Sequence, residues 1–214
     1  MTTTIDDLDR LADRAARYAR YARSAGGLSS VIGGVLLVAS FTANAFAELT
    51  PATRALLAAT PLLWLAAKEL LRRRYYQRPG EMLPAPTPKE LRQHRWAVVY
   101  LAVIALIVLG VFVRAWIGAG RPPEGQMFGY ILVVLALPLA AWRWFWSVSD
   151  FLVGVLLFCQ SAVVIGGGHY PAIWLAYVAA CAGIAIAYGW REHRDYLGLR
   201  AELQGDADDP VETL

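Results

Sequence analysis

Charged residues are scarce in this sequence. Of 214 residues, 17% are Asp, Glu, Lys or Arg and 57% are hydrophobic, whereas soluble domains carry about 25% charged residues. The charges are also confined, because six long stretches contain none and the ionisable clusters lie between or beyond them. This composition disfavours a soluble domain and predicts an integral α-helical membrane protein.

Cysteine and lysine are also rare. Cys159 and Cys181 both fall inside apolar stretches, so we expect reduced thiols that pack as small hydrophobic side chains. Among 20 basic residues, Lys68 and Lys89 are the only lysines, a bias typical of high-GC bacterial genomes that favours a bacterial inner membrane. The first thirty residues lack the apolar core and cleavage site of a signal peptide, so we expect the first span to act as the insertion signal.

Motifs for chemistry are missing as well. The sequence has no HExxH motif, no paired aspartates inside an apolar stretch and no glycine-rich phosphate loop followed by Lys and Ser or Thr. The interiors of the apolar stretches hold no ionisable residue, which disfavours ion-coupled transport. We therefore predict a non-enzymatic protein without a cofactor or a metal. An enzyme acting on lipid would need Glu48, Asp150, His169 and His193 to converge, but the predicted topology divides them between two faces.

The N-terminal residues 1–25 predict an amphipathic helix. Thr4-Ile5-Asp6-Asp7 is close to a capping box, and apolar positions then recur in steps of three and four. Gly26-Gly27 is expected to end or bend this helix. Its alanine-rich face is weakly apolar, so three alternatives stay open: it lies on the membrane surface, it binds a cytoplasmic partner, or it packs on the second loop of this chain.

The predicted architecture is an all-α bundle of six transmembrane spans. Within residues 26–195, we place the spans at about 28–47, 52–71, 96–113, 127–142, 151–166 and 171–190. Thr50-Pro51 and Thr87-Pro88-Lys89-Glu90 each predict a helix start. Pro61 should kink the second span, and Lys68 and Glu69 should snorkel at its end.

The polar segments set the orientation. A cytoplasmic loop 72–95, stiffened by prolines, joins the second and third spans, and an acidic tail 196–214 is expected to be disordered after Ala201. One side of the six spans receives 17 Lys and Arg residues and the other receives 3. By the positive-inside rule, both termini are predicted to be cytoplasmic. Because the basic residues flank apolar spans, they do not indicate nucleic-acid binding.

Several polar residues are candidate site residues. Asn44, Gln160, Ser161 and Tyr177 could line a path or bind a lipid headgroup, although the alternative is hydrogen bonding between helices. Small residues in stripes on the first and sixth spans allow close helix packing, either within the bundle or against a second copy or another subunit.

The layout is shared, at the level of architecture, by permease subunits of some ATP-driven exporters, and it predicts a separate ATPase docking near Glu90, Arg92 and Arg95. Our first hypothesis is a non-enzymatic, permease-like or accessory subunit of a membrane complex. The alternative is a membrane sensor or regulator that binds a cytoplasmic partner through its N-terminal helix and its tail. The expected partners are the lipid bilayer and either other subunits or a second copy of the chain.

Overall fold

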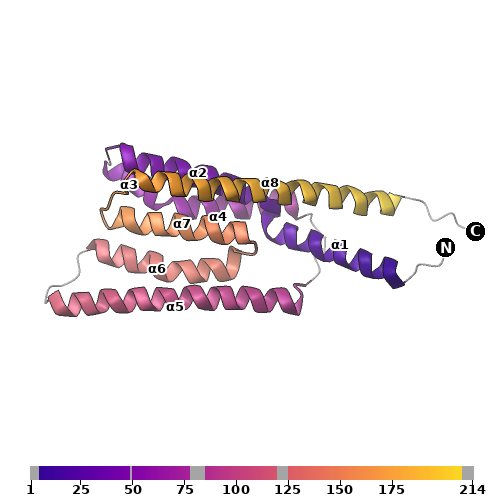
Figure 1. Ribbon diagram of the computed structural model, residues 1–214, viewed down its shortest axis with the longest axis horizontal. Helices are drawn as coiled ribbons and strands as arrows, with labels where there is room; N and C mark the ends of the chain where they lie inside the picture. The colour runs from indigo at the N-terminus through magenta and orange to yellow at the C-terminus, as the bar shows by residue number, and fades with distance from the viewer. Residues whose placement is uncertain (1–4, 49, 78–84, 120–124, 209–214) are drawn as a thin grey trace, which may run out of the picture.

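The computed structural model describes residues 5–48, 50–77, 85–119 and 125–208 (Figure 1). Within these ranges the regular elements are all helical, which confirms the all-α prediction. In chain order they are α1 (Ile5–Arg23), η1 (Ala25–Gly27), α2 (Leu28–Phe46), α3 (Pro51–Ala58), α4 (Thr60–Leu71), η2 (Arg72–Tyr76), α5 (Pro88–Ala119), α6 (Gly125–Trp144), α7 (Val148–Ile165) and α8 (Ile173–Asp208).

The bundle is built as a row of helices with a second group packed on one of them. α5, α6 and α7 lie side by side, and α7 packs against α2, α3 and α4 (Figure 1). α8 runs along α2 over most of the bundle and then continues beyond it. α1 leaves the bundle at the same end and lies beside the projecting part of α8. We call α1 together with residues 191–208 of α8 the stalk.

Local sequence signals fix two of the helix starts. Thr50 accepts a hydrogen bond from the Thr53 amide at 3.3 Å, and Pro51 occupies the first turn of α3. At α5, Thr87 Oγ1 accepts from the Glu90 amide at 3.3 Å while a Glu90 carboxylate oxygen accepts from the Thr87 amide at 3.1 Å. Both predicted starts are therefore confirmed, the second as a reciprocal capping box.

The predicted kink at Pro61 appears as a break between α3 and α4. A proline at this position cannot donate to the Leu57 carbonyl. The Thr60 hydroxyl donates to that carbonyl instead, at 2.7 Å. The break therefore leaves no orphaned acceptor at Leu57, although Leu57 and Thr60 are both buried.

The chain bends between α1 and α2, as the two glycines predicted. Ala25 and Gly27 both have positive φ, at 60° and 84°, a conformation that favours glycine and strains alanine. A Cβ atom on Gly27 would lie 2.1 Å from the Gly189 carbonyl oxygen of α8. The missing side chain thus allows η1 and α8 to cross in close contact.

The apolar core lies where α2, α4, α6, α7 and α8 meet. It includes Leu37, Trp64, Phe145, Leu157 and Val178, all essentially buried. The Trp64 and Phe145 rings pack at 5.5 Å between centroids. Gly154 makes room for Phe145, since a Cβ there would lie 2.2 Å from the ring.

In the part of the chain that the structure describes, four helical segments are long and apolar enough to cross a membrane: Arg10–Phe46, Pro88–Gly118, Val148–Ile165 and Ile173–Glu202. The apolar part of α6, Gly129–Trp144, is shorter, and the second predicted span is divided into α3 and α4. Apolar helices compatible with membrane insertion are thus found, while the number six stays a prediction.

The C-terminal segment differs from its prediction as far as it is described. Residues after Ala201 were expected to be disordered, but α8 continues as a helix to Asp208. Part of the predicted proline-rich loop (78–84), residues 120–124 between the third and fourth predicted spans, and the acidic end of the tail (209–214) lie outside the described residues.

Candidate functional site

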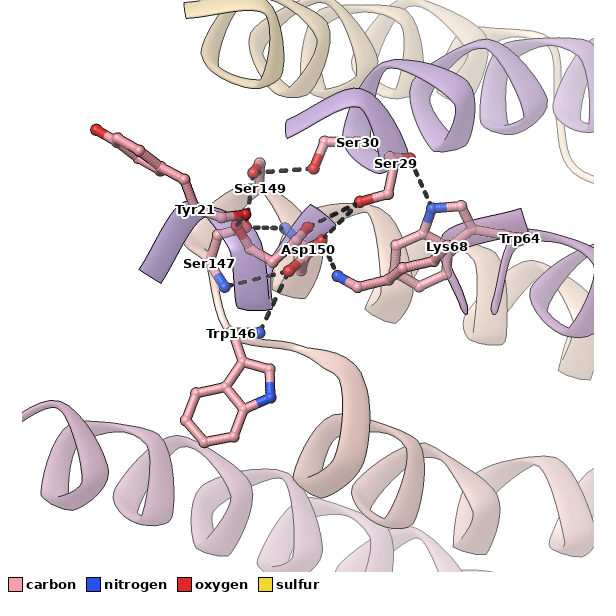
Figure 2. Close-up of polar contacts among 10 residues, drawn as sticks. Tyr21, Ser29, Ser30, Trp64, Lys68, Trp146, Ser147, Ser149 and Asp150 are labelled. Carbon is pink, nitrogen blue, oxygen red and sulfur yellow. Dashed lines mark hydrogen bonds and ion pairs between the residues drawn. The ribbon is translucent and has the colours of Figure 1, made fainter. Parts of the chain in front are cut away.

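A buried ion pair lies at the end of the bundle from which the stalk projects. Lys68, in the last turn of α4, places its ammonium nitrogen 2.5 Å from a carboxylate oxygen of Asp150, in the first turn of α7 (Figure 2). The residues are 1% and 0% exposed. Charged residues are rarely buried to this extent unless they are paired, so the pair ties α4 to α7. We call this end of the bundle, which also contains Glu90 and Glu192, the charged end.

The α6–α7 turn positions Asp150. Ser147 caps α7 by accepting from the Asp150 amide at 3.1 Å, and Asp150 accepts in return from the Ser147 amide at 3.2 Å. The Trp146 amide donates to the same carboxylate oxygen at 3.2 Å. A carboxylate in this position also faces the positive end of the helix dipole. These contacts position the Asp150 carboxylate independently of Lys68.

The position of Lys68 corrects a prediction. The side chain was expected to snorkel toward water, but it is buried and points into the protein toward Asp150 (Figure 2). Trp64, one turn earlier on α4, donates its indole N–H to the Ser29 carbonyl at 2.8 Å, and its ring lies 5.6 Å from the Lys68 nitrogen. Packing against α2 thus covers the side chain that was expected to reach the surface.

A layer of buried serines joins α2 to the ion pair. The Ser29 hydroxyl lies within hydrogen-bond distance of the Ser24 carbonyl, at 3.2 Å, and of Asp150, at 3.4 Å. Ser30 donates to Ser149 at 3.0 Å, and Ser149 in turn lies 2.9 Å from Ser147. Small hydroxyls of this kind satisfy buried polar groups without separating the helices. The pair is therefore linked to the start of α2, next to the bend.

A second charged group lies closer to the surface. Arg20 and Arg23 of α1 approach the two carboxylate oxygens of Glu90 on α5, at 3.8 and 3.3 Å. This contact places Glu90, one of the three predicted docking residues, within the chain's own packing. Arg92 and Arg95, the other two, are exposed on α5. The predicted alternative in which α1 packs on the second loop is the arrangement found, since α1 also contacts η2.

Aromatic side chains connect the stalk to the bundle. The Tyr76 hydroxyl lies 2.8 Å from His193 Nδ1, and the Tyr76 ring packs edge-on against Tyr196 at 4.8 Å. Tyr18 of α1 stacks on Tyr196 at 5.2 Å. A tyrosine hydroxyl is a neutral phenol at physiological pH, and burial raises the pKa of the Tyr76 hydroxyl further. The base of the stalk is therefore held by aromatic packing and a neutral hydrogen bond.

The candidate path residues lie in separate helix contacts. Asn44 accepts from the Tyr170 amide at 2.9 Å, Gln160 accepts from Ser40 at 2.8 Å, and Ser161 donates to the Ala58 carbonyl at 2.6 Å. Tyr177 is exposed on α8. Asn44 and His169, whose Nδ1 lies 3.0 Å from the Asn44 carbonyl, belong to the end opposite the charged end, which we call the turn end. These four candidates do not form one site.

Sequence reasoning missed the ion pair, although two signals pointed to it. Ser147-Val148-Ser149-Asp150 precedes an apolar run in the pattern of a capping box. Lys68 is one of two lysines, and it follows Trp64 by one helical turn inside a predicted span. Neither signal reveals that the two side chains meet, because the contact is set by tertiary packing.

The chemistry available at the charged end is electrostatic. Within the described ranges, no group of three or more His, Cys, Asp and Glu residues is arranged to hold a metal ion. The buried ion pair and the serine hydroxyls fix helices to one another, and the Arg20–Arg23–Glu90 cluster, which lies closer to the surface, offers charge to a ligand or partner. No protein-family model, curated protein or solved structure matches this chain.

Proposed function

We propose that this chain is a non-enzymatic accessory subunit of a bacterial inner-membrane complex and that its stalk binds a cytoplasmic partner. The observation that carries the proposal is the stalk itself, which projects past the ends of the other helices as a paired unit (Figure 1). It is anchored at its base by the aromatic packing around Tyr196 and by Glu90, next to the buried ion pair. A rigid, charged projection of this kind offers a surface for another protein.

Six spans with both termini in the cytoplasm complete the proposed topology. Two features support it: the 17-to-3 distribution of Lys and Arg, and the gathering of Lys68, Glu90, Asp150 and Glu192 at one end of the bundle, where alternate spans would end. We propose Arg73→Cys, at an exposed position, in a chain with Cys159→Ala and Cys181→Ala. A membrane-impermeant thiol reagent added to intact cells should leave it unlabelled, whereas Thr53→Cys should react.

The outer face of the stalk provides the variants for the main test. Arg10 and Arg17 are exposed on α1, and Arg92 and Arg95 are exposed at the start of α5 on the same side of the proposed membrane. We propose purification from native membranes of wild type, of Arg10→Glu with Arg17→Glu, and of Arg92→Glu with Arg95→Glu. A stoichiometric partner should be lost from the first double variant and retained by the second.

The reverse result would move the partner to the 72–95 loop and favour the permease-like hypothesis with its docked ATPase. Retention of the same partner by both double variants, or a wild-type protein that purifies alone, would count against docking through charged surfaces. Circular dichroism of each purified variant should match the wild type, so that loss of the partner is not mistaken for loss of folding.

The regulator hypothesis is favoured by one observation, the bend between α1 and α2. Ala25 is a non-glycine residue in the left-handed region, which stores strain. A regulator would move the stalk on receiving a signal, whereas an accessory subunit would hold it fixed. Spin labels on α1 and α8, with their distance measured with and without bound partner, separate the two hypotheses.

A further inference from the structure

A cavity of about 530 Å³ opens at the charged end between α1 and the first turns of α5 and α7, with α8 behind it. Its charged wall consists of Arg20 and Arg23 on one side and Glu90 and Glu192 on the others. His94 and Trp146 form an aromatic wall, with rings stacked at 4.2 Å and an interplanar angle of 7°. The cavity therefore presents both signs of charge next to an aromatic surface.

A second cavity, of about 290 Å³, lies between α5, α6 and α7 and is lined mainly by apolar side chains. On α5, the first cavity is lined by residues 90, 93, 94 and 97 and the second by 101, 104, 105 and 108. These positions continue in steps of three and four, so they form one stripe on one face of the helix. On α7, Phe151 and Phe158 follow the same spacing. The polar cavity and the apolar cavity thus succeed one another along the same pair of helices.

We propose that the two cavities bind one phospholipid whose headgroup carries a primary ammonium. The phosphate lies against Arg20 and Arg23, the ammonium is held by Glu192 and His94, and one acyl chain lies in the apolar cavity. The inference rests on the bilayer placement of the proposed function, because it puts the charged end at the level of the headgroups.

The arginines supply the site for the phosphate. Arg20 and Arg23 both approach the carboxylate of Glu90, so two guanidinium groups line one side of the cavity. Guanidinium groups suit phosphate oxygens because their N–H donors form a planar fork. Basic pockets between helices near the cytoplasmic surface of a membrane bind phospholipid headgroups by this chemistry.

Two acceptors supply the site for the ammonium. Among the described residues, Glu192 Oε2 and His94 Nδ1 are buried and have no hydrogen-bond partner, and both residues line the cavity. His94 is 7% exposed, and its Nε2 lies 3.1 Å from the Trp142 carbonyl. A carbonyl accepts, so Nε2 carries the proton and Nδ1 of the neutral ring is an acceptor. A primary ammonium donates three hydrogen bonds, whereas the trimethylammonium of a choline headgroup donates none.

The test uses the purified full chain, delipidated in detergent and titrated with phosphatidylethanolamine, phosphatidylcholine or phosphatidylglycerol of the same acyl chains, with native mass spectrometry as the readout. One phosphatidylethanolamine per chain should bind about tenfold more tightly than the other two, an affinity ratio of the size expected from one charged hydrogen-bonded contact. O-Phosphoethanolamine, the soluble headgroup, should compete weakly because it lacks the acyl chain.

Matched variants assign the parts of the site. Arg20→Gln with Arg23→Gln should weaken binding of all three lipids by about 10- to 30-fold, while Arg17→Gln, at an exposed position outside the cavity, should not. Glu192→Gln should remove the preference for ethanolamine over choline and leave binding of phosphatidylglycerol unchanged. Ile104→Trp, at the partly exposed edge of the apolar cavity, should weaken lipid binding but not the competition by the soluble headgroup.

Equal binding of the three lipids to the wild type would overturn the proposal, as would equal effects of Arg17→Gln and the double arginine variant. A folded Glu192→Gln protein that keeps the ethanolamine preference would also overturn it. Thermal unfolding of each variant identifies one that has lost its fold, and His94→Phe then provides a second test of the ammonium site. Because the readout needs no partner protein, failure here is distinct from failure of the stalk to bind one.

Discussion

Buried polar groups join the helices at both ends of the bundle, but the groups differ between the two ends. At the charged end, α4 and α7 are joined by full charges, Lys68 and Asp150, that are buried completely. At the turn end, α2 is joined to the α7–α8 turn by the neutral amide of Asn44 and the backbone of Tyr170. A buried charge without its partner is far more costly than an amide without one. The comparison teaches that the charged end is the less tolerant of change, and it is also the end from which the stalk projects.

The largest effect is expected from breaking the charged end at Asp150. Asp150→Ala leaves the Lys68 ammonium buried without a counter-charge, which should destabilise the protein by about 3–5 kcal/mol. The measurement is the unfolding of the detergent-solubilised protein during titration with a denaturing detergent, monitored by circular dichroism. The double variant with Lys68→Met should recover part of the loss, because it removes the orphaned charge. A double variant no more stable than Asp150→Ala would contradict the role assigned to the pair.

A steric change at the same end should have the next largest effect. Gly27→Ala places a Cβ atom against the Gly189 backbone and forces an alanine into the left-handed conformation at φ 84°. We therefore expect the stability to fall by about 1–3 kcal/mol in the same assay. Gly183→Ala is the control, because a Cβ there meets nothing within 4 Å. On helix propensity alone it should be neutral or slightly stabilising. If Gly27→Ala and Gly183→Ala lost the same stability, the close contact between Gly27 and Gly189 would not be the cause of the loss.

At the turn end, a smaller loss is expected. Asn44→Ala removes the amide that accepts from the Tyr170 amide and should cost about 0.6 kcal/mol, and at most about 1.7, as for other hydrogen bonds between membrane helices. The loss stays small because the turn that contains the Tyr170 amide can adjust when its acceptor is removed. If Asn44→Ala lost as much stability as Asp150→Ala, the charged end would not be less tolerant of change than the turn end.

The smallest effect is expected on the stalk. Arg14 and Glu202 lie 3.5 Å apart with side chains 42% and 56% exposed, so water screens the pair. Arg14→Ala should change stability by less than about 1 kcal/mol. Tyr196→Ala, which removes a buried ring that stacks on Tyr18, should cost more. The contrast would show that aromatic packing, and not surface charge, holds α1 to α8.

The sequence predicted those features that depend on neighbouring residues. The cap at Thr87 and Glu90, the break at Pro61 and the bend at the paired glycines each follow from contacts within one or two turns. The ion pair depends on where α4 and α7 meet, which no local pattern contains. The same reason explains the error at Lys68: at the end of an apolar stretch, a lysine that snorkels and a lysine that is covered by another helix have the same local sequence.

The pairing of α1 with α8 joins the first helix of the described residues to the last. The ribosome releases α1 long before Tyr196, the ring on which Tyr18 stacks, has been synthesised. During that interval, the alanine face of α1 lacks its neighbour on α8. The α1–α8 contact therefore cannot form before α8 has been synthesised, so a shorter nascent chain lacks this surface.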